Sequence, residues 1–346
     1  MKAHIKYLYI LILVPVMTFS CAESDNEADH KVTLTLAAFT VPKQAYQKRI
    51  IPAFRQYWKL KTGQIVTFEQ SYEASGVQAR TIAAGFEADI AALSLEQDMD
   101  PLEKAGLITH NWKDSKSGGF VTRSVVVIAY RPGNPKRIKD WDDLKRDDVD
   151  VLYPNPKTSG GAMWAVNAIY GAGLKLTEAK TGKPDKAYAR DLLKSIQRRV
   201  KAMDKSGRMS VTTFENGIGD ALVTYENEAL LRQKQGKNFP FVIPRATILI
   251  ENPVAIVDKN VDKHGNREVA EAFIKFLFTK NTQRTFSLYG FRPVDKELAQ
   301  ELQNKYPVPE YLFDVNYLGG WRSIKEELYG PDGIWTKIIE ELTHER

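Results

Sequence analysis

Three parts of the chain each read as a strand, a short turn and a helix in succession. The paired segments are residues 32–38 and 43–58, residues 65–69 and 77–84, and residues 149–154 and 162–172. The first segment of each pair has the apolar pattern of a strand, and the second has apolar side chains at helical spacing. Residues 70–76 are turn-like. This alternation predicts an α/β protein whose ligand lies at the carboxyl ends of parallel strands, against helix N-termini.

Small and hydroxyl residues collect where these helices begin. Thr158, Ser159, Gly160 and Gly161 precede the third helix, and Ser75 and Gly76 precede the second. The first amides of a helix lack partners within it, and adjacent glycines let a ligand approach the backbone. A cap is the commoner role of a serine or threonine at this position. Thr40 lies in the turn before the first helix, and three such loops together indicate an anion site.

The first thirty residues have the features of an export signal and a tether. An apolar run at residues 7–17 follows Lys2 and Lys6, and it is too short to span a bilayer. Cys21, the only cysteine, then follows a small residue, and this arrangement looks like a bacterial lipobox. We therefore expect a signal peptide at residues 1–20 and an acylated Cys21 with a flexible tether at residues 21–31. Conventional cleavage nearby is the alternative.

Length and composition favour two lobes and exclude several functions. A chain of 346 residues with 43% hydrophobic residues can form two cores. Removing Lys2 and Lys6 with the signal leaves 47 bases and 43 acids, which is too mild a bias to indicate nucleic-acid binding. The five histidines are scattered, without metal-ligand spacing or a partner for a nucleophilic serine. We expect no metal and no cofactor.

Two long motifs carry a resemblance to a known family. The segments at residues 155–162, Asn-Pro-Lys-Thr-Ser-Gly-Gly-Ala, and at residues 59–71, Lys-Leu-Lys-Thr-Gly-Gln-Ile-Val-Thr-Phe-Glu-Gln-Ser, resemble the signatures of the prokaryotic sulfate- and thiosulfate-binding proteins of ABC transporters. Residues 134–144, 217–222, 226–230 and 319–321 also read like this family. The similarity covers nearly the whole mature chain.

The resemblance implies a two-lobed periplasmic clamp of type II, each lobe a mixed sheet flanked by helices, with the anion in the hinge cleft. We expect one lobe to comprise residues 32–121 and 251–300, and the other residues 122–250. Residues 301–346 would form a helical segment packed on the lobes. The implied protein is a monomeric receptor in the periplasm, not an enzyme, held at the membrane only by its lipid anchor.

The family's binding residues can be carried over by motif. Donors to the anion would be Ser159, Gly160 and Gly161, the hydroxyl of Ser75, and backbone amides at Thr40 and Gly207; the aromatic residue at the site would be Tyr225. Glu73 stands where the family has small residues, and we expect it to point away from the dianion.

The implied partners are sulfate or thiosulfate and the subunits of an ABC permease. Molybdate and phosphate are alternative ligands, and an anion-handling enzyme with Ser159 as nucleophile is the alternative class. An enzyme of this kind needs a nearby base, which the sequence does not provide.

Overall fold

A computed structural model describes residues 31–345 of the chain. Within these residues the strands form one ten-stranded mixed sheet of order β2-β1-β3-β9-β4-β7-β5-β6, with β10 paired to β9 and β8 to β4. The strands are β1 (Lys31–Phe39), β2 (Ile65–Glu73), β3 (Ile90–Ala92), β4 (Phe120–Tyr130), β5 (Val151–Leu152), β6 (Val200–Ala202), β7 (Ala221–Tyr225), β8 (Phe241–Val242), β9 (Ala246–Ile256) and β10 (Tyr311–Phe313).

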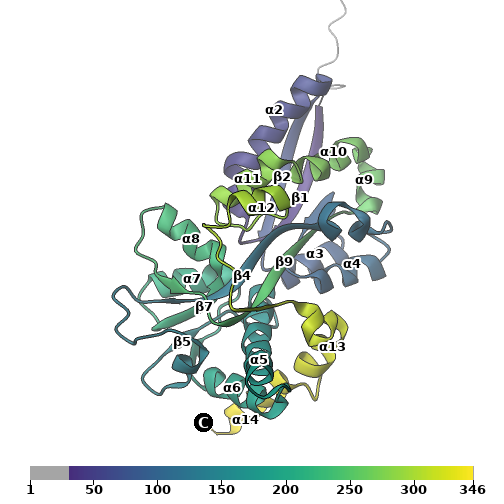
Figure 1. The fold of residues 1–346 in the computed structure, drawn as a ribbon. Helices are drawn as coiled ribbons and strands as arrows, with labels where there is room; N and C mark the ends of the chain where they lie inside the picture. The colour runs from purple at the N-terminus through teal and green to yellow at the C-terminus, as the bar shows by residue number, and fades with distance from the viewer. Residues whose placement is uncertain (1–30, 346) are drawn as a thin grey trace, which may run out of the picture.

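Helices cover both faces of this sheet (Figure 1). They are α1 (Lys43–Ala45), α2 (Ile51–Thr62), α3 (Ser75–Ala83), α4 (Asp100–Lys104), α5 (Gly160–Thr181), α6 (Lys186–Arg198), α7 (Gly207–Glu215), α8 (Glu226–Lys234), α9 (Asp258–His264), α10 (Arg267–Leu277), α11 (Lys280–Leu288), α12 (Lys296–Glu301), α13 (Gly320–Tyr329) and α14 (Ile334–His344). Short 3₁₀ turns connect several of them, among them η2 (Glu96–Asp98).

The two long strands β4 and β9 join two lobes. In β4, residues up to Val125 pair with β9, whereas residues from Val126 onward pair with β7. β9 continues in the other direction to pair with β3 through Ile256. The first lobe is thus built on β1, β2 and β3 with α1–α4 and α9–α12, and the second on β5–β8 with α5–α8 (Figure 1). The C-terminal helices α13 and α14 pack on the second lobe.

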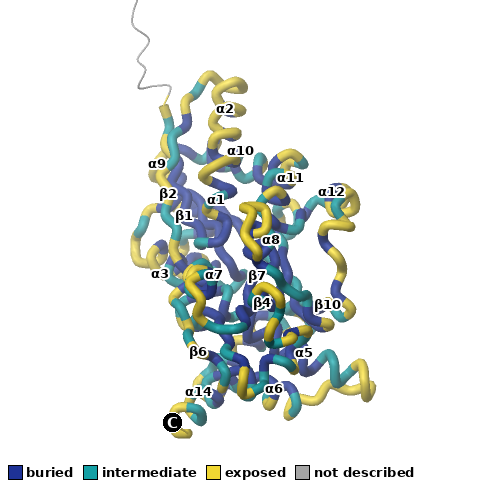
Figure 2. The backbone as a smooth tube through the Cα atoms, turned by 90° about the vertical axis from the view of Figure 1, so that its left-hand side faces the viewer, coloured by how far each residue is buried: buried dark blue, intermediate teal, exposed yellow. Residues whose placement is uncertain are grey.

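The buried residues lie along the sheet and run continuously through both lobes, while the outer faces of the helices are exposed (Figure 2). In the first lobe Phe54 of α2 packs against Phe273 of α10, with ring centroids 4.9 Å apart. In the second, Trp164 of α5 packs against Trp321 of α13 at 5.0 Å. Burial of such large side chains is the main favourable contribution to folding.

The three strand-turn-helix units predicted from the sequence are present, with several differences in their bounds. The predicted helix at residues 43–58 consists of α1, a π-helical segment at Tyr46–Ile50 and α2, which continues to Thr62. The predicted strand at residues 149–154 is limited to β5. The strand β2 continues to Glu73, so residues 70–73 are not the predicted turn, and Ala74 alone separates β2 from α3. The third helix is longer than predicted because α5 begins at Gly160 and ends at Thr181, before Gly182 with φ +81°. The mixed sheet and the helices on its faces agree with the predicted α/β class.

Candidate functional site

A small cavity lies between the lobes, where several strands end and several helices begin. Its volume is about 10 Å3. The lining residues come from the turns after β1 and β3, the starts of α3, α5 and α7, and the end of β7; they are Phe39, Thr40, Val41, Ala74, Ser75, Ser94, Ser159, Gly160, Gly161, Ser206, Gly207 and Tyr225. All seven residues that the sequence assigned to ligand binding therefore line one cavity.

The cavity is lined by neutral donors rather than by charges. None of its lining residues is an aspartate, glutamate, lysine, arginine or histidine. The amides of Gly160 and Gly161 at the start of α5, and of Gly207 at the start of α7, donate to no backbone carbonyl within residues 31–345. These amides stand at the positive ends of their helix dipoles, so the cavity has a positive potential without containing a cation.

Ser159 occupies the position before α5 but does not cap it. Its side chain accepts no hydrogen bond from the amides of the first helical turn. Ser206, at the same position before α7, does cap its helix, because its hydroxyl accepts from the amide of Met209 at 3.3 Å. The capping role, the commoner one for a serine at this position, is thus wrong for Ser159, and its buried hydroxyl is available to a ligand.

Ser75, at the start of α3, is held by two hydrogen bonds. Its hydroxyl donates to Asp98 Oδ2 at 2.5 Å and accepts from the amide of Ser94 at 2.8 Å. Asp98 is the last residue of η2 and lies just outside the cavity. The sequence did not indicate either of these contacts.

Tyr225, the last residue of β7, places its phenol at the cavity. The phenol oxygen is 2.7 Å from the hydroxyl of Ser94 in the other lobe. Burial raises the pKa of the Tyr225 phenol well above its usual range, so the group is a protonated donor at physiological pH. The hydroxyls of Ser94 and Tyr225 have two hydrogens between them, and their mutual hydrogen bond uses one. The other hydrogen can point toward a ligand.

Further hydrogen bonds hold the lobes together around the cavity. The carbonyl of Ser94 accepts from Trp164 Nε1 of α5 at 3.0 Å and from Asn252 Nδ2 of β9 at 2.9 Å. Arg208 of α7 donates from Nη2 to the carbonyl of Val41 in the first lobe at 2.9 Å. The bonds from Trp164 and Arg208 join the two lobes, and the bond from Asn252 fixes the carbonyl of Ser94 within the first lobe.

Two buried glutamates near the cavity have arginine partners. The Nη2 atom of Arg208 lies 2.8 Å from Oε1 of the fully buried Glu228, which also pairs with Arg232. Glu226 forms two hydrogen bonds with Arg292, at 2.7 and 2.9 Å. Both glutamates therefore have structural ion-pair partners.

Glu73 is exposed and does not line the cavity. The carboxylate close to the cavity is instead Asp98. Sequence reasoning also missed Ser94, although a signal was present: it follows the apolar run at residues 90–93, which makes it a fourth hydroxyl residue at the end of a strand.

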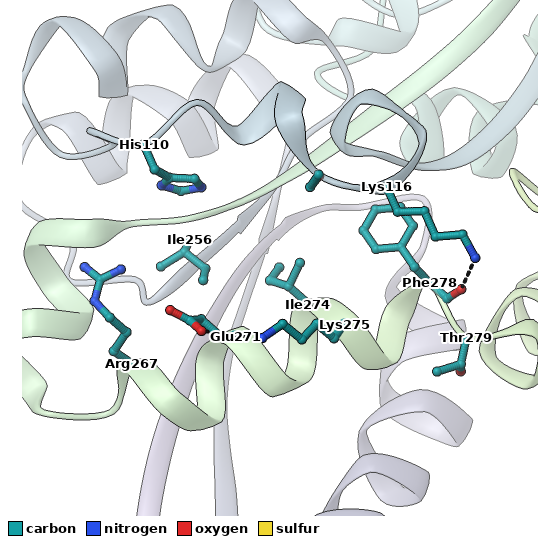
Figure 3. A pocket seen from close by; sticks show the side chains of 10 residues that line it. His110, Lys116, Ile256, Arg267, Glu271, Ile274, Lys275, Phe278 and Thr279 are labelled. Atoms are coloured by element: carbon teal, nitrogen blue, oxygen red, sulfur yellow. Dashed lines mark hydrogen bonds and ion pairs between the residues drawn. The ribbon is translucent and has the colours of Figure 1, made fainter.

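A larger cavity of about 670 Å3 lies elsewhere, against α10 in the first lobe (Figure 3). Its floor is apolar, from Ile256, Ile274 and Phe278. Its cations already have partners: Lys116 donates to the carbonyl of Phe278 at 3.4 Å, and Arg267 pairs with Asp258 at 2.9 Å. Lys275, the third cation that lines it, lies 3.6 Å from Oε2 of Glu271.

The part of the chain that the structure describes contains no group of three or more histidine, cysteine, aspartate or glutamate side chains arranged to hold a metal ion. Within residues 31–345, no helix combines the length and the apolar character needed to cross a membrane. Cys21 lies outside the described residues.

An α/β clamp of two lobes, with a cavity of helix N-termini between them, defines the class of type II periplasmic solute-binding proteins. The chain belongs to the family of bacterial extracellular solute-binding proteins, whose model matches residues 34–292. This match and the sulfate- and thiosulfate-binding relatives described next confirm the family predicted from the two motifs.

Named relatives extend along most of the chain. It is 39% identical to the sulfate-binding protein of Synechocystis sp. over 92% of its own length and 90% of the relative's. It is 33% identical to the thiosulfate-binding protein of Pseudomonas aeruginosa over 85% of its length and 88% of the relative's. Among solved structures, the sulfate-binding protein SubI from Mycobacterium tuberculosis is 35% identical, with a TM-score of 0.78 over 86% of this chain and 99% of SubI.

Proposed function

We propose that the protein is an extracytoplasmic receptor that binds sulfate or thiosulfate in the cavity between its lobes and delivers the anion to an ABC permease. The observation that carries this proposal is a cavity formed by helix N-termini and hydroxyls without any cation. Sulfate at neutral pH is fully ionised and only accepts hydrogen bonds, so neutral donors alone can satisfy it. The sulfate- and thiosulfate-binding relatives support the same ligand class.

In this proposal, each residue that was assigned to the site from the sequence donates a hydrogen bond to the anion. The amides of Thr40, Gly160, Gly161 and Gly207 and the hydroxyls of Ser75, Ser159 and Tyr225 surround it. Each hydrogen bond to a charged group contributes roughly 1.5–3 kcal/mol net, so a few such bonds suffice for tight binding.

Donors come from both lobes, so the anion stabilises the closed clamp, and the permease recognises that closed form. The residue ranges proposed for the lobes are 32–121 with 251–300, and 122–250, with residues 301–346 packed on them. β4 and β9 pass between these ranges, which supports a hinge there.

We further propose that the protein is a monomeric lipoprotein, with the signal peptide at residues 1–20 removed and Cys21 acylated. The motif before Cys21 supports this part of the proposal. The lipid chains would hold the receptor at the membrane beside its permease.

The alternative enzymatic role, with Ser159 as nucleophile, has little support. No residue lining the cavity can act as a general base, and the nearby Asp98 bonds Ser75 rather than Ser159. The relatives are named as binding proteins. Molybdate and phosphate are the remaining alternative ligands, and phosphate at neutral pH keeps a proton that needs an acceptor in the cavity.

Isothermal titration calorimetry against sulfate, thiosulfate, molybdate and phosphate tests the proposal. We expect tight binding of sulfate and no detectable binding of phosphate at equal concentration. Ser159→Ala should weaken sulfate binding by roughly 10- to 150-fold, because it deletes one bond to a charged group. Gly161→Asp should abolish binding with an unchanged circular dichroism spectrum. Tight phosphate binding in place of sulfate, or unchanged titrations of both variants, would contradict the assignment.

A further inference from the structure

The tip of the first lobe exposes three large apolar side chains around the end of α2. Leu60 is 81% exposed, more than any other large apolar residue within residues 31–345, and Tyr57 and Ile65 are each 41% exposed. Figure 1 shows α2 at the tip of this lobe, far from the second lobe, and Figure 2 shows its outer face exposed. Single exposed apolar residues are common, but three at one tip mark a candidate interaction surface.

The segment that forms this tip is also strongly basic. Residues 31–68 contain seven basic residues and no acidic one, whereas the rest of the mature chain has 40 bases and 43 acids. This segment alone therefore accounts for the positive net charge of the mature chain. In the part of the chain that the structure describes, none of the seven forms an ion pair; they are Lys31, Lys43, Lys48, Arg49, Arg55, Lys59 and Lys61.

Cationic and apolar side chains share the outer face of α2. Because an α-helix turns about 100° per residue, Lys59 and Lys61 lie on either side of Leu60, and the buried residues of α2 lie on the opposite face. Lys31, the first residue of β1, pairs with Ile65 at the same end of the lobe. We call this surface the α2 patch; it consists of Lys31, Tyr57, Lys59, Leu60, Lys61 and Ile65.

Carboxylates border the α2 patch only on the side of α10. There Glu268 and Glu271 line a groove together with Tyr57 and Lys61. Glu271 also lies 3.6 Å from Lys275 Nζ, which offsets its charge. The outer face of α2 itself has no acidic residue. A partner that contacts this face therefore meets cations and exposed apolar side chains together.

We propose that the α2 patch lies on the membrane surface, where its lysines contact anionic phospholipid headgroups and Leu60 enters the boundary between headgroups and acyl chains. Helices that lie on membranes combine cations with exposed apolar side chains in this way. Each basic residue close to an anionic lipid surface strengthens the attraction. The patch thus has the composition of a lipid-binding surface.

The position of the tether supports the membrane as the partner, and for this point the inference rests on the proposed lipid anchor. The tether joins the fold at Lys31, within the α2 patch. From Cys21 to Lys31 the chain spans at most roughly 35 Å, so an acylated Cys21 keeps the patch near the lipid surface. The contact orients the anchored receptor, and attachment still depends on the acyl chains.

The acidic tether is the other candidate for this surface. Residues 22–30 contain four acidic residues, which could neutralise the lysines of the α2 patch. Their only apolar side chains are those of two alanines, so the tether offers no large apolar group to cover Leu60. A lipid surface matches both the charge and the apolar character of the patch.

Sedimentation with lipid vesicles tests the inference on the mature chain, residues 21–346, with Cys21→Ser so that no acyl chain contributes. The sheet and the buried core lie within the residues that this chain retains. We expect binding to vesicles of phosphatidylglycerol and phosphatidylcholine at low salt, and none to phosphatidylcholine alone. Binding should weaken as salt rises to about 0.15 M, where the Debye length is about 8 Å.

A triple variant tests the cations of the α2 patch. Lys31→Gln, Lys59→Gln and Lys61→Gln together should weaken vesicle binding by roughly 100-fold, because each basic residue near an anionic surface contributes about fivefold. The control changes the net charge equally at exposed lysines of the second lobe that also lack ion pairs among the described residues, and it should bind vesicles like the parent chain; it combines Lys139→Gln, Lys180→Gln and Lys183→Gln.

Leu60 tests the apolar part of the contact. Leu60→Gln should weaken vesicle binding by roughly tenfold, the lower end expected for burial of a leucine side chain. Val308→Gln is the control, because Val308 is 78% exposed at a site outside the patch. An environment-sensitive fluorophore on Leu60→Cys should shift to shorter wavelength with anionic vesicles, and the same fluorophore on Val308→Cys should not.

The outcomes distinguish this inference from the proposed function. Absence of binding to anionic vesicles at low salt, or equal loss of binding in both triple variants, would overturn the lipid contact and leave the sulfate receptor intact. A fluorophore at position 60 that is already shifted without vesicles, and released by high salt, would assign the patch to the tether instead. All of these variants should bind sulfate like wild type in calorimetry, and failure of wild type to bind sulfate would remove only the proposed function.

Discussion

The hydroxyl of Ser94 and the phenol oxygen of Tyr225 lie 2.7 Å apart and connect the two lobes across the proposed anion cavity. Ser94 follows β3 in the first lobe, and Tyr225 ends β7 in the second. The bond therefore exists only when the clamp is closed. It also positions the aromatic donor that the proposed site requires.

Tyr225→Phe removes this bond and the proposed donor to the anion while it keeps the packed ring. We expect sulfate affinity to fall by roughly 10- to 150-fold, as for loss of one bond to a charged group. Tyr170→Phe is the matched control, because the hydroxyl of Tyr170 bonds Glu327 far from the cavity at 3.2 Å. If Tyr225→Phe and wild type bind sulfate with equal affinity by calorimetry, the Tyr225 phenol is not a donor to the anion.

Gly160 is required by the close approach of the lobes. A Cβ atom at Gly160 would lie 2.6 Å from Ser94 Oγ and 2.7 Å from Ser94 Cβ, which are in the other lobe. Gly160→Ala should therefore oppose closure rather than folding. Overpacking of this kind costs typically 1–3 kcal/mol, so we expect roughly 5- to 150-fold weaker sulfate binding.

Gly207→Ala provides the control for this prediction, because a Cβ there has no atom closer than 3.9 Å. Small-angle X-ray scattering should detect a decrease in the radius of gyration on addition of sulfate for wild type and Gly207→Ala. The decrease should be smaller for Gly160→Ala. A full decrease in that variant, with unchanged affinity, would contradict a closure-specific role of Gly160.

Membrane attachment is predicted to depend on Cys21. The tether that follows it is polar and acidic, so it supplies no apolar anchor, and two acyl chains are what make anchoring stable. Cys21→Ser should move the protein from the membrane fraction to the soluble fraction of fractionated cells. Retention of the variant in the membrane, as firm as that of wild type, would rule out the lipid anchor.

The strand-turn-helix units could be predicted because their apolar positions follow the period of each element. The end of β2 could not be predicted in this way. Tyr72 and Glu73 pair with Ala38 and Phe39 at the edge of the sheet, where a strand tolerates polar side chains. Backbone pairing with β1, rather than the side-chain pattern, extends this strand.

The loops that line the cavity could be predicted from residue types at helix starts, but their hydrogen bonds could not. Ser159 and Ser206 stand at the same position before their helices, and only Ser206 acts as a cap. Asp98 resembles an ordinary surface acid in the sequence. Its contact with Ser75, 23 residues away, arises because η2 and the start of α3 meet in the folded chain.

His264 should make the stability of the first lobe dependent on pH. Its Nδ1 atom lies 2.7 Å from Oδ1 of the buried Asp89, and its Nε2 atom lies 3.1 Å from Oε2 of Glu87. The hydrogen bond to Asp89 raises the pKa of the His264 imidazole; burial opposes this shift and Glu87 adds to it. A histidine with a raised pKa in the folded state gives stability that is complete below its unfolded pKa and lost as pH rises through the folded value.

The free energy of unfolding in urea should therefore decrease between pH 6 and pH 9, with a contribution from His264 on the order of 1 kcal/mol or less, because the imidazole is partly exposed. In His264→Gln this contribution disappears, so the difference in stability between wild type and variant should narrow as pH rises. His344→Gln, at an exposed position in α14, is the control and should follow wild type at every pH. A constant difference between wild type and His264→Gln across this range would show that the neutral imidazole stabilises the lobe as well as the charged form does.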